Sequence, residues 1–473
     1  MEKDYHLVIL GGGTGGYVAG IRAAQLGFNV AIVEQDRLGG TCLHQGCIPT
    51  KALLRTAEVW STLHHASTFG ITVDNAKLDF SQAVTRKASI VEQLHKGIQF
   101  LMKKNQIDII YGRGRLMGPS IFSPQSGAVR VEEETGESRI LTPRFTLVAT
   151  GSSPKGLPGL DFDGTHVIHS GHALAISTLP QSAIIVGGGA IGVEWASLWN
   201  DLGVDVTLIE FMPSLLPAEE GEVSAELTRS FKKRKIRVRT GTQILSDTLV
   251  KSDDGITIRA RNGEHEETLS AHVLLVAVGR APNIQDIGLE GTEIQLHQGA
   301  ISVDEDYRTA EKNIFAIGDV IGGLQLAHVA AHEGIHAVEV MADLHPFPLN
   351  ELWIPRCTYT RPEVASLGLT ESQAKEQGHS VKIGKFSFKA NGKALIFGES
   401  DGFVKIVADS HNDDLLGVHM IGPHVTDLIS EAALATVLDS TPWELGNTIH
   451  PHPTLSEAIG EAALAVDGRA IHS

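Results

Sequence analysis

Two cysteines that lie five residues apart are the side chains in this sequence best suited to redox chemistry. Cys42 and Cys47 belong to the segment GGTCLHQGCIPTK, residues 39–51, where we expect a helix to begin. The start of a helix stabilises negative charge and so favours the thiolate, the reactive form of cysteine. The pair could close a redox-active disulfide, or the two residues could be small buried apolar side chains. A zinc site is disfavoured because zinc needs four ligands and no second Cys/His pair at metal spacing is evident, so we expect no bound metal.

A glycine-rich pattern that could hold a dinucleotide occurs twice. LVIL is followed by GGGTGG at residues 11–16, and IIV is followed by GGGAIG at residues 187–192. In a G-x-G-x-x-G turn, the first glycine permits a tight turn and the second lets the backbone approach a pyrophosphate, while the third lets helix and strand pack closely. These positions are Gly11, Gly13 and Gly16 in the first copy and Gly187, Gly189 and Gly192 in the second.

Each copy ends in an acid at the same distance from its turn. Glu34 and Glu210 both lie 23 residues beyond the first glycine of their copy, at the end of a second strand. A carboxylate at this position can accept hydrogen bonds from a ribose. The alternative, two glycine-rich turns in an ordinary α/β protein, leaves the paired acids unexplained. We therefore expect two dinucleotide sites.

The elements around these sites predict an α/β protein with two doubly wound, Rossmann-like domains, because two different dinucleotides need two such domains. Further strand-like runs complete the sheets at residues 145–149, 273–277 and 314–317. We expect a helical arm between about residues 74 and 104. The Gly, Ser and Pro residues around 112–128 and 151–159 indicate loops and linkers.

The pattern changes after about residue 350. Alternating strands at 403–407 and 415–419 precede a helical run at 425–438. Strands followed by helices are typical of a separate α+β domain.

Composition limits the possible partners and compartments. The 473 residues include 39 Lys and Arg against 56 Asp and Glu, a formal net charge of −17, which repels nucleic acid and anionic lipid. The three cysteines are too few for a secreted disulfide scaffold, and no signal-peptide pattern or membrane-length apolar run is evident. We expect a cytoplasmic protein of several domains.

The whole chain resembles the pyridine nucleotide–disulfide oxidoreductases, and most closely those that oxidise dihydrolipoamide. GGTCLHQGCIPTKALL resembles the redox-active segment of that family. Further family motifs follow in the family's order: ATG at 149–151, VGRAPN at 278–283, AIGD at 316–319, LAH at 326–328, YTRPEVA at 359–365 and HPHPTLSE at 450–457.

The resemblance implies catalytic roles for four residues. Cys42 would exchange disulfides with the substrate, and Cys47 would face the flavin. His452 would be the general base that deprotonates the incoming dithiol, and Glu457 would orient it. Because family members place this histidine in the active site of the partner subunit, an obligate homodimer is implied.

The cofactors implied by the resemblance are FAD and NAD. The first dinucleotide unit would hold FAD, with Glu34 on its adenosine ribose and Lys51 near the flavin. The second would hold the nicotinamide cofactor, and the Glu210 carboxylate favours NAD because it repels the 2′-phosphate of NADP. The remaining cofactor-binding positions would be Gly151, Glu194, Gly279, Asp319, Ala327 and His328.

The resemblance also divides the chain into domains. Residues 1–150, with the redox cysteines, and residues 279–350 would form the FAD-binding part. Residues 151–278 would form the NAD-binding domain, and residues 351–473 the dimerisation domain. The implied reaction is the FAD-dependent oxidation of protein-bound dihydrolipoamide to lipoamide with reduction of NAD⁺ to NADH. The implied partners are a lipoyl domain and the E2 core of a 2-oxo acid dehydrogenase complex.

Departures from the family pattern point to one branch. Gln325 replaces the methionine often found before LAH, and His44 and Gln45 replace a pair such as Asn-Val. The residues at 321–325 and at His44 resemble those of the branch that serves branched-chain 2-oxo acid complexes. Cys357 has no motif around it that needs a thiol, and we interpret it as structural.

Two other functions stay open. A glutathione-reductase-like disulfide reductase is the nearest alternative, although Glu210 disfavours its NADPH. From a different class, the chain could be a flavoprotein scaffold, but that role leaves Cys42, Cys47 and His452 without a purpose.

Overall fold

The computed structural model describes residues 4–119, 126–133 and 135–472. The chain forms two compact units, and each is described by itself. Unit 1 contains Met1–Leu53, Asp79–Lys155 and Arg280–Leu349, and unit 2 contains Leu54–Leu78, Gly156–Gly279 and Asn350–Ser473. None of the helices in the described ranges is both long enough and apolar enough to cross a membrane.

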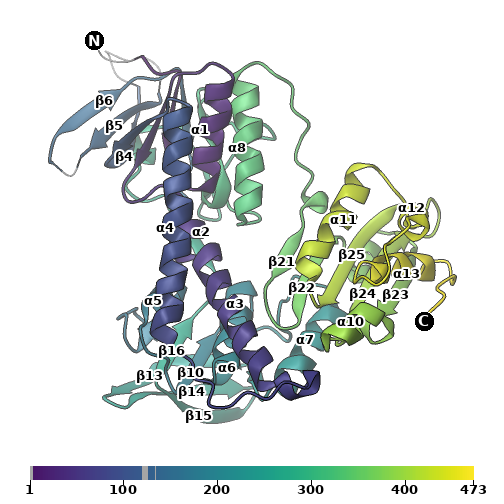
Figure 1. The fold of residues 1–473 in the computed structure, drawn as a ribbon. Coiled ribbons are helices and arrows are strands. Elements are labelled where there is room, and N and C mark those ends of the chain that lie inside the picture. Colours follow the sequence, from purple (N-terminus) through teal and green to yellow (C-terminus); the bar gives the residue numbers. More distant parts are fainter. Residues whose placement is uncertain (1–3, 120–125, 134, 473) are drawn as a thin grey trace. The chain divides into compact units, whose positions relative to one another are not determined.

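A five-stranded parallel sheet forms the centre of unit 1. Its strands, in order across the sheet, are β20 (Ile314–Ala316), β7 (Phe145–Val148), β1 (Leu7–Leu10), β2 (Val30–Glu34) and β3 (Asp108–Tyr111). The helices on one face are α1 (Thr14–Gln25), α4 (Phe80–Lys104) and α8 (Ala327–Met341). Helices α1 and α8 lie side by side, in purple and green in Figure 1.

The other face of this sheet packs against a three-stranded antiparallel sheet. Its strands are β4 (Arg113–Met117), β5 (Ala128–Glu132) and β6 (Ser138–Leu141). All four residues of β1 are buried, as expected for a parallel strand that is covered on both faces.

Shorter elements complete unit 1 and include those that carry Cys42, Cys47, Lys51 and Asp319. They are α2 (Gly40–Gln45), the start of α3 (Cys47–His64), β8 (Ser152–Pro154), β17 (Arg280–Pro282), β18 (Leu296–His297), β19 (Ala300–Ile301) and the 3-10 turns η2 (Leu289–Gly291) and η3 (Gly318–Ile321). Helix α3 begins in unit 1 and ends in unit 2. Strands β8 and β17 pair antiparallel.

Unit 2 repeats the architecture of unit 1 in its first half. Its parallel sheet has the order β12 (Arg237–Arg239), β11 (Asp205–Ile209), β10 (Ser182–Val186), β16 (Val273–Val276) and β9 (Val167–Ile168). One face packs against the antiparallel strands β13 (Gln243–Ser252), β14 (Gly255–Asn262) and β15 (His265–Ala271). The helices are α5 (Ser170–Ala175), α6 (Ala190–Asp201) and α7 (Gly221–Lys233).

The C-terminal part of unit 2 is an antiparallel sheet with helices packed on it. The strand order is β21 (Arg356–Thr358), β22 (Glu363–Gly368), β25 (Leu415–Gly422), β24 (Phe403–Asp409) and β23 (Val381–Ser387). The helices are α9 (Glu371–Glu376), α10 (Gly392–Phe397), α11 (Val425–Val437), α12 (Pro442–Asn447) and α13 (Glu457–Ala465). The 3-10 turns of unit 2 are η1 (Ala66–Phe69), η4 (Glu351–Trp353) and η5 (Phe388–Ala390).

The structure confirms the predicted fold class, with two parallel sheets and a C-terminal α+β part. The predicted loops were wrong in part, because residues 112–128 include β4 and residues 151–159 include β8. Gly114 lies within β4, and a Cβ there would lie 2.6 Å from a methyl carbon of Leu10. That glycine therefore reflects close strand packing and not a turn. Residues 120–125 of the first predicted loop lie outside the described residues.

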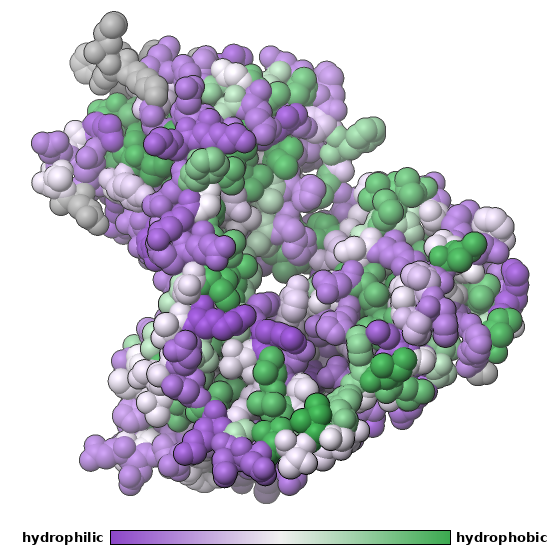
Figure 2. Space-filling view, viewed as in Figure 1, coloured by the Kyte–Doolittle hydropathy of each residue, from purple (hydrophilic) through white to green (hydrophobic). Residues whose placement is uncertain are grey.

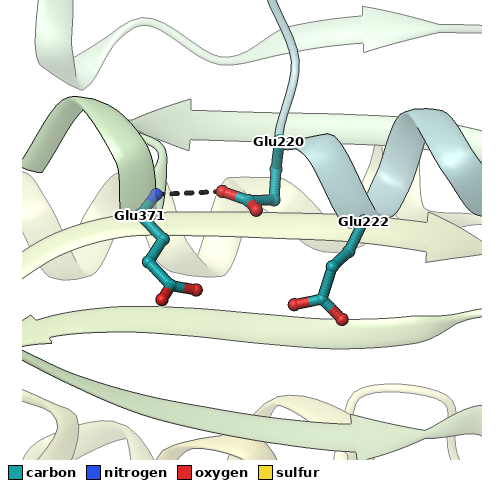
Figure 3. Close-up of side chains that lie close together, drawn as sticks. All are labelled: Glu220, Glu222 and Glu371. Carbon is teal, nitrogen blue, oxygen red and sulfur yellow. Dashed lines mark hydrogen bonds between the residues drawn. The ribbon is translucent and has the colours of Figure 1, made fainter. Parts of the chain in front are cut away.

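Four ionic side chains of unit 2 meet around the buried Lys405. The Nζ atom of Lys405, whose side chain is 1% exposed, lies 3.0 Å from Glu220 Oε1, 2.7 Å from Glu222 Oε1 and 2.6 Å from Glu371 Oε2. Figure 3 shows these carboxylates together, with the backbone N–H of Glu371 donating to Glu220. Burial alone would lower the pKa of Lys405, but its hydrogen bonds to the carboxylates raise it. Because the ammonium lies among the carboxylates, the cluster is an ion-pair network that joins α7 to β24 and not a metal site.

Candidate active site

The two cysteines predicted to be redox-active meet at the junction of two helices in unit 1. Cys42 belongs to α2, and Cys47 is the first residue of α3. Their side chains are hydrogen-bonded to each other as free cysteines. Gly46 turns the chain between the helices, and a Cβ there would lie 3.0 Å from the carbonyl oxygen of Thr41. This tight turn brings the two sulfur atoms into contact.

The two cysteines influence each other's ionisation. The hydrogen bond to Cys47 and burial raise the pKa of Cys42, whereas the positive charge of Lys51 opposes that rise. Two thiols in contact resist losing both protons, because the second thiolate would lie against the first. Once one cysteine is a thiolate, the other is therefore favoured to keep its proton.

Arg280 is a site residue that the sequence interpretation missed. Its Nε lies 2.7 Å from Ser152 Oγ, its Nη2 lies 2.5 Å from the Ser152 carbonyl oxygen, and its Nε lies 3.6 Å from Asp319 Oδ2. Burial lowers the pKa of Arg280, and the charges of Asp319 and Cys47 oppose that change. The guanidinium thus connects the predicted cofactor residue Asp319 with the cysteine pair. The sequence signal for it is the VGRAPN motif, of which Gly279 alone received a role.

The first dinucleotide turn needs its glycines for steric reasons. Gly11 has φ of 103°, and a Cβ there would lie 2.3 Å from the Ala149 carbonyl oxygen. A Cβ at Gly16 would lie 1.9 Å from the carbonyl oxygen of Gly11. Glu34 stabilises the turn by accepting hydrogen bonds from the backbone N–H groups of Gly12, at 2.7 Å, and Asp36, at 2.9 Å.

The second turn, in unit 2, has the same construction. Gly187 has φ of 111°, and a Cβ at Gly192 would lie 1.8 Å from the Gly187 carbonyl oxygen. Glu210 accepts hydrogen bonds from the backbone N–H of Gly188 and, at 2.6 Å, from that of Met212.

The helices that follow the two turns fit a dinucleotide pyrophosphate. Helix α1 begins after Gly13 and α6 begins after Gly189. Neither of these N-cap residues makes a side-chain capping hydrogen bond, and neither helix has an acid in its first turn. Their first backbone N–H groups are therefore suited to an anion. No Cβ contact within 4 Å would arise at Gly189, so the backbone there can be approached closely.

The other predicted cofactor residues are divided between the units. In unit 1, Lys51 lies in α3 and Asp319 in η3, where it accepts a hydrogen bond from Ser152. Ala327 and His328 begin α8, whose N-cap makes no side-chain capping hydrogen bond. Gly151 in unit 1 and Gly279 in unit 2 have φ of 71° and 115°. Also in unit 2, Glu194 of α6 accepts a hydrogen bond of 3.0 Å from the backbone N–H of Tyr359.

The predicted base and its orienting acid are joined in unit 2. His452 Nδ1 lies 2.8 Å from Glu457 Oε1, and the Thr454 N–H donates to Glu457 Oε2 at 2.8 Å. Burial alone would raise the pKa of Glu457, but these hydrogen bonds lower it and keep the carboxylate ionised. Asn391 fixes the loop by donating from Nδ2 to the Thr454 carbonyl oxygen at 3.0 Å. The His452 side chain is 77% exposed, so the ring can receive a proton from a substrate.

Two family models match this chain. Residues 5–334 match the model described as pyridine nucleotide-disulphide oxidoreductase, and residues 354–463 match the dimerisation domain of that family. The chain belongs to the pyridine nucleotide-disulphide oxidoreductase family.

Two relatives that match along the full chain are named dihydrolipoyl dehydrogenase. A dihydrolipoyl dehydrogenase of Bacillus subtilis is 58% identical over 473 residues, which cover 100% of both chains. A dihydrolipoyl dehydrogenase of Zymomonas mobilis is 43% identical over 475 residues and also covers 100% of both. The crystal structure of LpdA from Mycobacterium tuberculosis superposes with a TM-score of 0.90 at 28% identity, over 97% of this chain and 98% of that one.

The matched dimerisation domain of this oxidoreductase has an apolar outer surface. Leu434, Val437 and Leu438, at the end of α11, are 59%, 59% and 66% exposed. Figure 2 shows hydrophobic side chains gathered over α11. Contiguous apolar surface of this kind is typical of a protein interface. The family match and this surface together support a homodimer.

Proposed function

We propose that this protein is a dihydrolipoyl dehydrogenase, which oxidises protein-bound dihydrolipoamide to lipoamide and reduces NAD⁺ to NADH. The observation that carries the proposal is the contact of Cys42 with Cys47 at the start of α3, beside Lys51. The similarity to dihydrolipoyl dehydrogenases along the entire chain supports it.

The proposed cofactors are FAD in unit 1 and NAD in unit 2, in agreement with the family. The fit rests on the two glycine turns, the uncapped starts of α1 and α6, and the acids Glu34 and Glu210. Residues 1–150 and 279–350 would bind FAD, residues 151–278 would bind NAD, and residues 351–473 would form the dimer interface. When bound, FAD would supply an acceptor for the electron pair of the reduced cysteines and a hydride donor for NAD⁺.

The thiol chemistry follows from the cysteine pair. Starting from the Cys42–Cys47 disulfide, a substrate thiolate attacks Cys42, forming a mixed disulfide and releasing Cys47 as a thiolate. The second thiol of the substrate then attacks the substrate sulfur that is bonded to Cys42. This closes the lipoamide ring and releases Cys42 as a thiolate. Two electrons and two protons leave the substrate, and the enzyme holds the dithiol. Lys51 and Arg280 are the cations that stabilise the negative charge of the reduced pair.

The base in this scheme is His452 of the partner subunit, as the family resemblance implies, so the active form is a homodimer. A neutral imidazole accepts the proton of the substrate thiol, and Glu457 stabilises the imidazolium that forms. The Nδ1 contact to Glu457 leaves Nε2 as the nitrogen that receives this proton.

The proposed partners are a lipoyl domain and the E2 core of a 2-oxo acid dehydrogenase complex in the cytoplasm. The segment 321–325 and His44 favour a branched-chain complex. A glutathione-reductase-like activity is the second candidate, and the Glu210 carboxylate argues against it by disfavouring NADPH.

The proposal is tested by the initial rate of NADH formation from NAD⁺ and dihydrolipoamide, with a parallel assay of NADPH and oxidised glutathione. We expect the first reaction and not the second. A reversed result would replace the proposed function by the glutathione-reductase-like one.

A further inference from the structure

A second histidine, His450, lies beside the His452–Glu457 pair in unit 2. Its Nε2 lies 2.7 Å from Glu431 Oε1, and its side chain is 9% exposed. The ring packs on Gly460 of α13, where a Cβ would lie 2.9 Å from Nδ1. His450 belongs to the motif HPHPTLSE, but that motif alone predicted no role for it.

The contacts of His450 favour its protonated form. The ring has a hydrogen bond with the Glu431 carboxylate. A carboxylate in contact with an imidazole favours the imidazolium. The hydrogen bond to Glu431 raises the pKa of His450 by more than burial lowers it, and the charge of Glu457 adds to the rise.

Glu457 therefore interacts with both histidines, in two different ways. Its Oε1 lies 2.8 Å from His452 Nδ1. The positive charge of His450 also helps to lower the pKa of Glu457. The charged groups acting on His450 are Glu431 from α11 and Glu457 from α13.

We propose that His450 is a positioning residue, held by Glu431 so that its positive charge partly balances Glu457 and sets the pH range in which His452 accepts a proton. This rests on the proposed function, in which His452 is the base. Without the charge of His450, Glu457 acts on His452 alone and keeps that imidazole protonated up to a higher pH. A protonated His452 cannot take the proton of the dithiol, so activity on the acid side of the profile falls.

The first test is the pH dependence of kcat/KM for dihydrolipoamide in the flavin-loaded protein. The variants are H450Q, E431Q and the double variant. We expect each to move the acid limb to higher pH, lowering kcat/KM about threefold near pH 6, with little change on the plateau. The double variant should move no further than H450Q, because E431Q acts by removing the partner that keeps His450 charged.

The matched control is H472Q. His472 Nδ1 lies 2.7 Å from Glu461 Oε1 in a similar pair, but its side chain is 71% exposed. H472Q should leave the acid limb of the kcat/KM profile at the same pH as in the parent. Electron transfer from NADH to ferricyanide, which needs no dithiol base, should be unchanged in all variants and reports that each remains folded and flavin-loaded.

The second test does not depend on the substrate. In protein with ¹³C-labelled histidine rings, the signal lost in H452Q identifies His452, and its titration midpoint should rise in H450Q and E431Q. An unchanged midpoint in both variants would overturn the role of His450. If the parent protein does not oxidise dihydrolipoamide, the proposed function fails, while this titration still decides whether His450 acts on His452.

Discussion

Glu210 accepts a hydrogen bond from the backbone N–H of Gly188, across the turn that follows β10. In unit 1, Glu34 makes the same contact with Gly12. The acid thus stabilises each turn before any ligand is considered, and its second oxygen is held by another backbone N–H two residues beyond the acid. The two copies of the glycine-rich motif therefore share the same hydrogen bonds between the terminal acid and the backbone.

The first prediction concerns cofactor choice. Replacing Glu210 by Ala removes the carboxylate proposed to bind the ribose of NAD and to repel a 2′-phosphate. We expect kcat/KM for NAD⁺ to fall about tenfold or more, as for the loss of a hydrogen bond to a charged group, and the preference over NADP⁺ to shrink. The corresponding E34A variant is the control: it should lose flavin on dilution while the NAD preference of its flavin-loaded fraction is retained. An unaltered NAD⁺/NADP⁺ ratio in E210A would contradict the assignment of Glu210.

How far the sequence could predict the site depends on whether each contact is local. The glycine turns and their acids lie within about thirty residues of chain, so their spacing already indicates their geometry. Arg280 is different, because it meets Ser152 through the pairing of β17 with β8, two strands far apart in sequence. The same pairing explains why residues 151–159 were predicted as a loop.

Close packing was a further limit. A glycine such as Gly114 suggests a turn, yet Gly114 lies in β4, at a point where Leu10 leaves no room for a side chain. The pair of His450 with Glu431 joins a loop to α11 across nineteen residues, and nothing in the spacing indicates it. Contacts of this kind become visible only when the sheet and its helices are assembled.

The second prediction separates the roles of the two cysteines. In C47S, dithiol oxidation should be abolished while the protein still binds flavin, because no disulfide with Cys42 can form for the substrate thiolate to attack. Thiol titration before and after reduction by NADH should give two new thiols per chain in the oxidised parent protein and none in C47S. Retained oxidation of dihydrolipoamide by C47S would exclude the proposed exchange. A C357S variant is the control and should behave as the parent does.

The third prediction concerns the buried ion network. Replacing Lys405 by Met leaves the carboxylates of Glu220, Glu222 and Glu371 together without their cation, and we expect a loss of about 3–5 kcal/mol in the free energy of unfolding. The control K251M breaks the exposed pair with Asp163, 2.6 Å apart, and should cost less than about 1 kcal/mol. Chemical denaturation of both variants measures the difference. Equal losses would show that the network contributes no more than a surface pair.

The pH dependence of stability follows from the same network. Burial alone would raise the pKa of Glu222, but hydrogen bonds from Lys385 and Lys405 lower it, and hydrogen bonds from Lys375 and Lys405 lower that of Glu371. A carboxylate with a lowered folded-state pKa stabilises the fold above its unfolded-state pKa and loses that contribution as pH falls through the folded value. We therefore expect the parent to lose stability below about pH 4.5, the ordinary range of glutamate. In K405M this acid-side loss should be smaller, as measured by denaturation midpoints between neutral and acid pH.

The last prediction uses two glycines of one turn that differ in their surroundings. A Cβ at Gly192 would lie 1.8 Å from the Gly187 carbonyl oxygen, whereas a Cβ at Gly189 would meet nothing within 4 Å. G192A should therefore lower the thermal midpoint, because the start of α6 must move away from the turn. G189A should fold as the parent does, since its backbone φ of −74° suits alanine, but its methyl group would occupy the space proposed for the NAD pyrophosphate. We expect G189A to raise KM for NAD⁺ with an unchanged thermal midpoint and unchanged reduction of the flavin by dihydrolipoamide. If G189A bound NAD⁺ like the parent, the pyrophosphate would have to lie away from the start of α6.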